Sequence, residues 1–103
     1  MRLVFAESAA RDLEDIIDYI ALDNPPAAQG VYRAIAAAAE RLSDLPELGR
    51  AGRLPGTREL TVAALPYMII YEVGAEVVTV LAVFHGARDL AQALAERRKT
   101  LEP

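Results

Sequence analysis

The chain has 103 residues, enough for one compact domain over residues 1–103, and its composition of 53% hydrophobic and 25% charged residues is that of a globular protein. It has no cysteine and only one histidine, which argues against disulfides and metal sites, so we expect no metal and no cofactor. The formal net charge of −4 makes free nucleic acid a poor candidate partner, because proteins that bind phosphates normally carry a basic excess.

The sequence gives no sign of a membrane or secreted protein. No apolar run approaches the roughly 18 residues that cross a bilayer, and the N-terminal segment turns acidic too early for a secretory signal. Residues 1–23 hold six acidic residues against Arg2 and Arg11. We therefore expect a cytoplasmic protein with no membrane contact.

The N-terminal half predicts a strand followed by two helices. Residues 2–5 form a short strand, and Ser8 is placed to cap a helix that follows it. The apolar residues of this helix recur at helical spacing: Ala9, Leu13, Ile16, Ile17 and Ile20. Its acidic residues lie toward water: Asp12, Glu14, Asp15 and Asp18.

The second helix begins beside the first. Asn24 can cap it, Pro25 suits its first position, and its apolar seam runs from Ala28 to Leu45 before Pro46 ends it. Because the connection between the two helices is so short, they must form an antiparallel hairpin.

The C-terminal half predicts a sheet. A loop over residues 46–56 leads into strands at residues 58–62, 67–73 and 76–84. Apolar positions at Leu90, Ala93, Leu94 and Leu101 indicate a final helix, ending in the basic residues Arg97, Arg98 and Lys99. The predicted fold class is α+β: an N-terminal strand and an antiparallel helical hairpin packed on a small antiparallel sheet, with a short C-terminal helix.

Candidate functional residues gather at the ends of this sheet. His85, which ends the last strand, is either a general acid or base, a target contact, or a strand-end histidine bonded to a carbonyl. The cationic loop of Arg50, Arg53 and Arg58 either binds phosphate or an acidic helix, or forms local salt bridges with Glu47 and Glu59.

Three further residues allow two interpretations each. Tyr67 and Tyr71 share one strand face, where tyrosines more often pack against a helix than serve a partner or chemistry. Arg88 either faces a partner or pairs with Asp89 or Glu59.

The order GR-x-G, GTREL, Y-x-I-x-Y-x-V, V-x-VL-x-V-x-HGARD, after a strand and a helical hairpin, resembles the RelE/ParE superfamily of bacterial type II toxins. The resemblance implies a toxin neutralised by an antitoxin encoded beside it. The antitoxin's C-terminal segment would wrap the toxin, and its N-terminal part, which we expect to be of the ribbon-helix-helix type, would bind operator DNA. Operator DNA would then be reached only through the antitoxin.

Two branches of this superfamily differ in target: RelE-like members cut mRNA in the ribosome, whereas ParE-like members poison DNA gyrase. RelE-like members commonly carry a cation where this chain has Met68, and a late tyrosine where Gly86 follows His85. The resemblance therefore favours a ParE-like, non-enzymatic toxin with gyrase as its target. Two alternatives remain: a metal-independent mRNA endonuclease using Arg58, His85 and Arg88, and an inactive member kept as an antitoxin-binding partner.

This interpretation assigns two surfaces. The target- or antitoxin-binding residues are Arg50, Arg53, Arg58, Tyr67, Tyr71, His85 and Arg88. The acidic face of the first helix, with Asp15 and Asp18, is expected to accept basic residues of the antitoxin.

Overall fold

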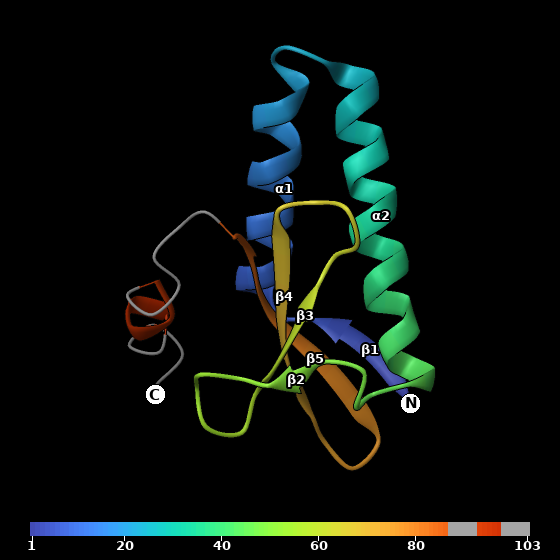
Figure 1. Cartoon of the computed structure of the whole chain (residues 1–103), viewed down its shortest axis with the longest axis vertical. Coiled ribbons are helices and arrows are strands. Elements are labelled where there is room, and N and C mark those ends of the chain that lie inside the picture. Colours follow the sequence, from blue (N-terminus) through green and yellow to red (C-terminus); the bar gives the residue numbers. More distant parts are fainter. Residues whose placement is uncertain (87–92, 98–103) are drawn as a thin grey trace.

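The computed structural model of the chain describes residues 1–86 and 93–97 (Figure 1). The elements are β1 (Arg2–Phe5), α1 (Glu7–Ala21), α2 (Pro25–Asp44), β2 (Arg50–Ala51), β3 (Arg58–Thr61), β4 (Tyr67–Val73) and β5 (Val77–His85). Residues 93–97 add a helical turn, which confirms a short C-terminal helix. The predictions for Arg88, Asp89, Leu90, Arg98, Lys99 and Leu101 fall outside the described residues.

The five strands form one sheet in the order β1-β5-β4-β3-β2. Strands β2 to β5 pair in antiparallel fashion, as predicted. Strand β1 pairs parallel to β5, with Arg2 opposite Val77 and Phe5 opposite Val80, so the N-terminal strand makes the sheet mixed, a pairing that the sequence did not predict. The chain between these strands includes the hairpin and three strands, which is ample length for a parallel crossover.

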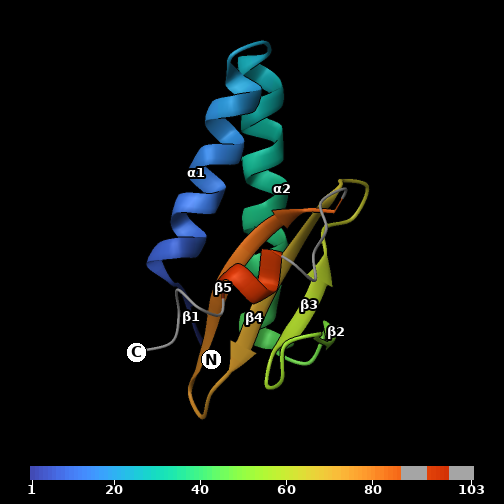
Figure 2. The ribbon, with the colours of Figure 1, turned by 90° about the vertical axis from the view of Figure 1, so that its left-hand side faces the viewer.

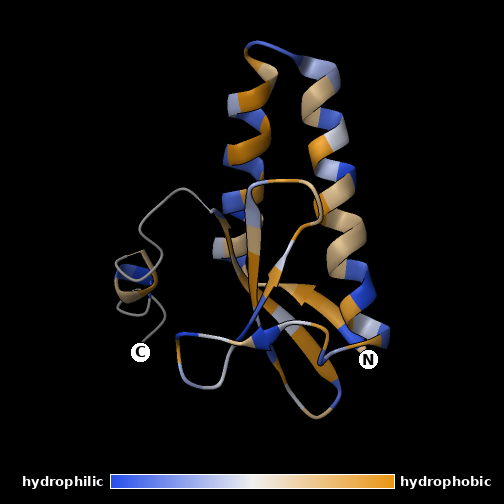
Figure 3. Ribbon diagram, in the orientation of Figure 1, coloured by the Kyte–Doolittle hydropathy of each residue, from blue (hydrophilic) through white to orange (hydrophobic). Residues whose placement is uncertain are grey.

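The helical hairpin covers one face of the sheet, and its tip extends beyond the strands (Figures 1 and 2). The core between them contains buried side chains from α1, α2, β4 and β5, among them Ala9, Ile35, Leu42, Ile69 and Val80. Hydrophobic and hydrophilic residues alternate along α1, and the strands are mainly hydrophobic (Figure 3). Burial of one apolar stripe of each helix is thus the main force that holds the hairpin on the sheet.

The ends of the helices match the predictions only in part. Asn24 caps α2, since its Oδ1 accepts a hydrogen bond from the Ala27 amide at 3.1 Å. Ser8 does not cap α1, because the helix begins at Glu7, directly after Ala6. The Ser8 hydroxyl donates instead to the Leu81 carbonyl at 3.1 Å. Leu45 was expected in the apolar seam, but it ends α2 with 52% of its surface exposed.

The opposite face of the sheet carries a second, smaller apolar cluster. Met68, Ile70 and Phe84 pack there against Leu94 of the C-terminal helical turn, with Leu54 at the margin. Figure 2 shows this turn lying over β4 and β5. The alternation predicted for β4 is therefore confirmed: Tyr67, Ile69 and Tyr71 face the hairpin cluster, and the residues between them face the second cluster.

Candidate functional site

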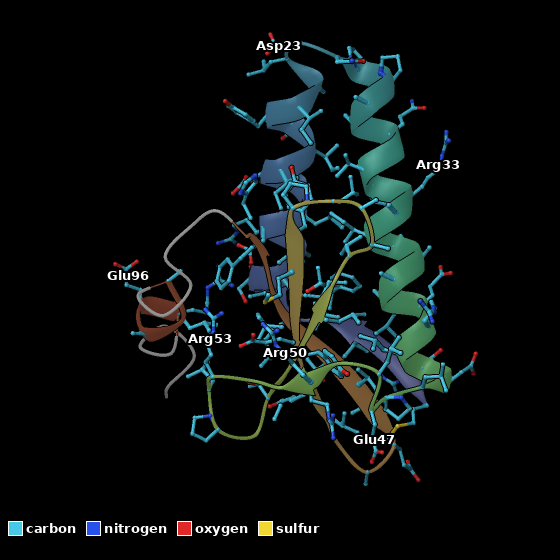
Figure 4. The ribbon with its side chains drawn as sticks, viewed as in Figure 1. Asp23, Arg33, Glu47, Arg50, Arg53 and Glu96 are labelled. Carbon is cyan, nitrogen blue, oxygen red and sulfur yellow. The ribbon has the colours of Figure 1, made fainter. Side chains whose placement is uncertain are left out.

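The arginine loop is organised around a buried carboxylate. The Glu59 side chain is 1% exposed, and its Oε1 lies 3.3 Å from Arg50 Nη2 and 3.9 Å from Arg53 Nε. Its Oε2 accepts a hydrogen bond from the Arg53 amide at 2.9 Å. The local salt bridges considered from sequence are therefore present at Glu59, although the Arg50 and Arg53 side chains remain 64% and 48% exposed (Figure 4). Glu47 forms no salt bridge with the described residues.

The side chains of Arg58 and Tyr71 form hydrogen bonds with the backbone of the segment that precedes this loop. Arg58 Nη1 donates to the Gly49 carbonyl at 2.6 Å and to the Glu47 carbonyl at 3.4 Å. The Tyr71 hydroxyl donates to the Pro46 carbonyl and accepts from the Gly49 amide, both at 2.8 Å. A Cβ at Gly49 would lie 2.8 Å from this hydroxyl, so the close approach requires glycine.

These contacts change the roles expected for two residues. Tyr71 is fully buried, which contradicts the expectation that it touches a target or an antitoxin. Arg58 is half-buried, and two backbone carbonyls already occupy one of its terminal nitrogens. Both side chains therefore shape the loop that presents Arg50 and Arg53.

His85 lies at the other end of the sheet. It pairs across the strands with Tyr67, and the two rings meet edge to face with centroids 5.4 Å apart and planes at 88°. His85 is half-buried, and Tyr67 is 9% exposed. Tyr67 therefore supports His85 from within the core and presents little surface to a partner.

An open groove adjoins this pair, between α1 and the end of β5, and encloses about 370 Å³. Its helical wall is a stripe of α1: Asp12, Asp15, Ile16, Tyr19 and Ile20. Its other wall comes from the sheet: Tyr67, Val83 and His85. The groove is thus apolar at its base, with two carboxylates, one imidazole and aromatic rings around it.

Asp12 is held by a network that the sequence did not reveal. Arg97 forms two hydrogen bonds with it, Nη2 to Oδ1 at 2.7 Å and Nη1 to Oδ2 at 3.0 Å, and each side chain is 17% exposed. Asp12 Oδ2 also accepts from the Val83 amide at 3.0 Å, and Arg97 Nη1 donates to the Leu81 carbonyl at 3.2 Å. The prediction that Asp12 lies toward water is therefore wrong.

Two of the three nuclease candidates, Arg58 and His85, lie apart in the structure. Arg58 lies opposite Tyr71 and His85 lies opposite Tyr67, at well-separated positions of β4. Tyr71 follows Tyr67 by four residues, which is about 13 Å along the strand. Arg88 lies outside the described residues.

The described residues also limit other kinds of site. His, Asp and Glu side chains within residues 1–86 and 93–97 form no group of three or more that could hold a metal ion. In the same part of the chain, no helix is both long and apolar enough to cross a membrane.

A helical hairpin on a mixed five-stranded sheet, with a short C-terminal turn on the opposite face, defines an α+β domain of the RelE/ParE type. The family model described as "ParE toxin of type II toxin-antitoxin system, parDE" matches residues 3–90. The chain therefore belongs to the ParE toxin family of the RelE/ParE superfamily.

Individual relatives agree with this family. The chain is 38% identical over 93 residues to "Putative toxin Y4kP" of Sinorhizobium fredii, covering 90% of this chain and 96% of that protein. It is 37% identical over 87 residues to "Toxin RelE2" of Caulobacter vibrioides, covering 84% of this chain and 97% of that protein.

A solved structure described as "Chromosomal ParDE TA system from P. aeruginosa" is similar, with a TM-score of 0.75 and 25% identity. The match covers 82% of this chain and 95% of the solved one. These names include both ParE and RelE, so they establish a toxin of a type II toxin–antitoxin system without choosing its target.

Proposed function

We propose that this toxin acts by binding DNA gyrase rather than by catalysis, and that a cognate antitoxin of the ribbon-helix-helix type neutralises it. Under this proposal operator DNA is bound by the antitoxin alone, and the target places the action in the cytoplasm. The ParE family model and the similarity to a ParDE system support this branch.

The observation that carries the proposal is the charge around His85. A general base for RNA cleavage needs cations close by, because negative charge builds up on the phosphate in the transition state. Among the described residues, the groove that His85 lines contains two carboxylates, Asp12 and Asp15, and no lysine or arginine. The described cation that bonds to one of its residues, Arg97, is already paired with Asp12. A phosphodiester entering here would meet the carboxylate of Asp15, which has no ion-pair partner among the described residues.

The position of Met68 supports the same conclusion. Met68 is 8% exposed and belongs to the apolar cluster with Ile70, Phe84 and Leu94. A cationic side chain at this position would have to extend out of that cluster to reach water. Burying a lone charge there would cost several kcal/mol, on the order of the desolvation penalty of an ion.

The surface that we assign to the target is the arginine loop. Arg50 and Arg53 remain about half or more exposed while Glu59 fixes the backbone beneath them. Exposed arginines on a loop held from within can bind a carboxylate-rich or phosphate-bearing surface at small cost in conformational entropy.

The test is a supercoiling assay with purified gyrase, purified toxin and no antitoxin. We expect inhibition together with accumulation of cleaved DNA, and we expect Arg50→Gln with Arg53→Gln to reduce inhibition by roughly tenfold. Arg33→Gln is the matched control, because Arg33 is an exposed arginine of α2 that bonds only to Gln29 within the described residues.

Three results would overturn the proposal. Saturating toxin that leaves gyrase unaffected, while its expression still arrests growth, would exclude gyrase as the target. Toxin-dependent cuts within translated mRNA that disappear in His85→Ala would establish the ribosome-dependent endonuclease instead. Growth unaffected by expression of the folded chain would identify an inactive family member.

A further inference from the structure

We propose that the groove between α1 and the end of β5 receives one basic side chain of the antitoxin, arginine in preference to lysine, with Asp15 as its ion-pair partner. This inference rests on the proposed neutralisation of the toxin by an antitoxin. It assigns the groove to that partner and separates it from the arginine loop assigned to the target.

The groove is small for a ligand site and large enough for one long side chain. Its volume of about 370 Å³ is near the lower limit of roughly 300–1,000 Å³ for small-molecule pockets. It is open to solvent along α1, whose residue Tyr19 stands 77% exposed at the groove. An exposed aromatic ring beside an open groove is typical of a protein-binding surface.

The charge of the groove specifies the side chain. Asp12 is satisfied by Arg97 and the Val83 amide. Among the described residues, no hydrogen bond or ion pair engages the carboxylate of Asp15, one turn further along α1. An anionic partner would be repelled by Asp15, and a purely apolar one would leave Asp15 partly desolvated without compensation.

The aromatic walls favour arginine over lysine. The exposed ring of Tyr19 lines the groove with Asp15, so a guanidinium could stack on this ring while it donates two hydrogen bonds to the carboxylate. A lysine ammonium lacks the planar group for that combination. The methylene stem of either side chain would pack on Ile16 and Val83.

The structure also distinguishes Asp15 from Asp18, two acidic residues to which the sequence assigns the same role. Both Asp15 and Asp18 are exposed on α1, but only Asp15 lines the groove. A partner held merely by the negative field of the helix would respond equally to both residues. A partner with a basic side chain in the groove would respond to Asp15.

The experiment measures binding of full-length toxin to a synthetic peptide of the antitoxin's C-terminal segment, taken from the reading frame beside the toxin gene. We expect Asp15→Asn to raise the Kd by roughly tenfold or more, and Asp18→Asn by less than about twofold. Tyr19→Ala should weaken binding several-fold. Tyr32→Ala is the control and should leave binding unchanged, because Tyr32 is an exposed tyrosine of α2 outside the groove.

A second set of peptides identifies the partner residue. Each arginine or lysine of the peptide is replaced in turn by methionine, and each variant is titrated against wild-type toxin and against Asp15→Asn. One replacement should lose its effect in the Asp15→Asn background, as a direct pair requires. Additive effects at every peptide position, or equal effects of Asp15→Asn and Asp18→Asn, would overturn the inference.

This result is independent of the target. The binding measurement contains no gyrase and the supercoiling assay contains no antitoxin. Coupling at Asp15 with no inhibition of gyrase would refute the proposed target and leave the groove assignment intact. Inhibition of gyrase without any coupling at Asp15 would refute the groove assignment and leave the proposed target intact.

Discussion

The bidentate pair of Asp12 and Arg97 should be one of the most valuable single contacts for stability, and Arg97→Met tests it. Removing one partner of a fully buried pair costs about 3–5 kcal/mol, whereas a fully exposed pair contributes about 0–1 kcal/mol. Since each side chain is 17% exposed, we expect a loss close to the buried limit, about 2–3 kcal/mol. Methionine keeps an apolar stem over the Phe84 ring, which the Arg97 guanidinium now covers at 5.2 Å.

Thermal unfolding followed by circular dichroism measures this loss. At about 4–8 °C per kcal/mol for a domain of this size, the expected fall in Tm is roughly 10–20 °C. Arg11→Met is the matched control: Arg11 pairs with Glu7 at 2.9 Å, a similar distance, but the two side chains are 68% and 87% exposed. Its loss should stay below about 0.5 kcal/mol.

A double-mutant cycle with Asp12→Asn isolates the pair itself. Asparagine keeps an oxygen for the Val83 amide, so the coupling energy reports mainly the contact with Arg97. We expect coupling of about 1–2 kcal/mol. Equal losses in Arg97→Met and Arg11→Met, or a coupling energy indistinguishable from zero, would show that burial does not strengthen this pair.

Three further substitutions test local features by urea or thermal unfolding. Tyr71→Phe should destabilise the protein by about 2–3 kcal/mol, because the buried Gly49 amide and Pro46 carbonyl both lose their partner; a loss below 0.5 kcal/mol would contradict that assignment. Asn24→Ala should cost about 1 kcal/mol through loss of the α2 cap, and no change would show that Pro25 alone starts the helix. Ala64→Gly should stabilise by up to about 1 kcal/mol, because Ala64 has a φ of 62° in the left-handed region, and a destabilised variant would refute strain there.

Features that depend on spacing within one segment could be predicted from the sequence. The 3.6-residue period identified the buried side of α1, and the period of two placed Tyr67, Ile69 and Tyr71 on one face. The Asn24 cap was equally local, since donor and acceptor are three residues apart. Burial of apolar stripes determines the first two features and a hydrogen bond between near neighbours determines the third, so the local pattern of residues predicts them all.

Features that depend on distant partners could not be predicted in this way. Asp12 and Arg97 lie 85 residues apart, and nothing near either residue in sequence announces the pair. The parallel pairing of β1 follows from the path of the whole chain. Glu59, by contrast, is close in sequence to the arginines and was considered from the sequence as their salt-bridge partner; its buried side chain holds Arg50 and Arg53 locally.

The length of β1 explains why an acidic groove forms beside β5. Strand β1 pairs with β5 only as far as Val80, so the rest of β5 has no strand neighbour on that side within the described residues, and α1 crosses there. Ser8 and Asp12, in the first turns of α1, bond to the Leu81 carbonyl and the Val83 amide and so satisfy part of this open edge.

The next turn of α1 reaches past those backbone groups, so Asp15 and Tyr19 project into open space beside His85. Arg97, the described arginine that bonds to a residue of the groove, is engaged by Asp12, and the arginine loop lies toward the other end of the sheet. The negative charge that remains at the groove is therefore a consequence of how the sheet ends, and it favours a basic partner there over a nucleic acid.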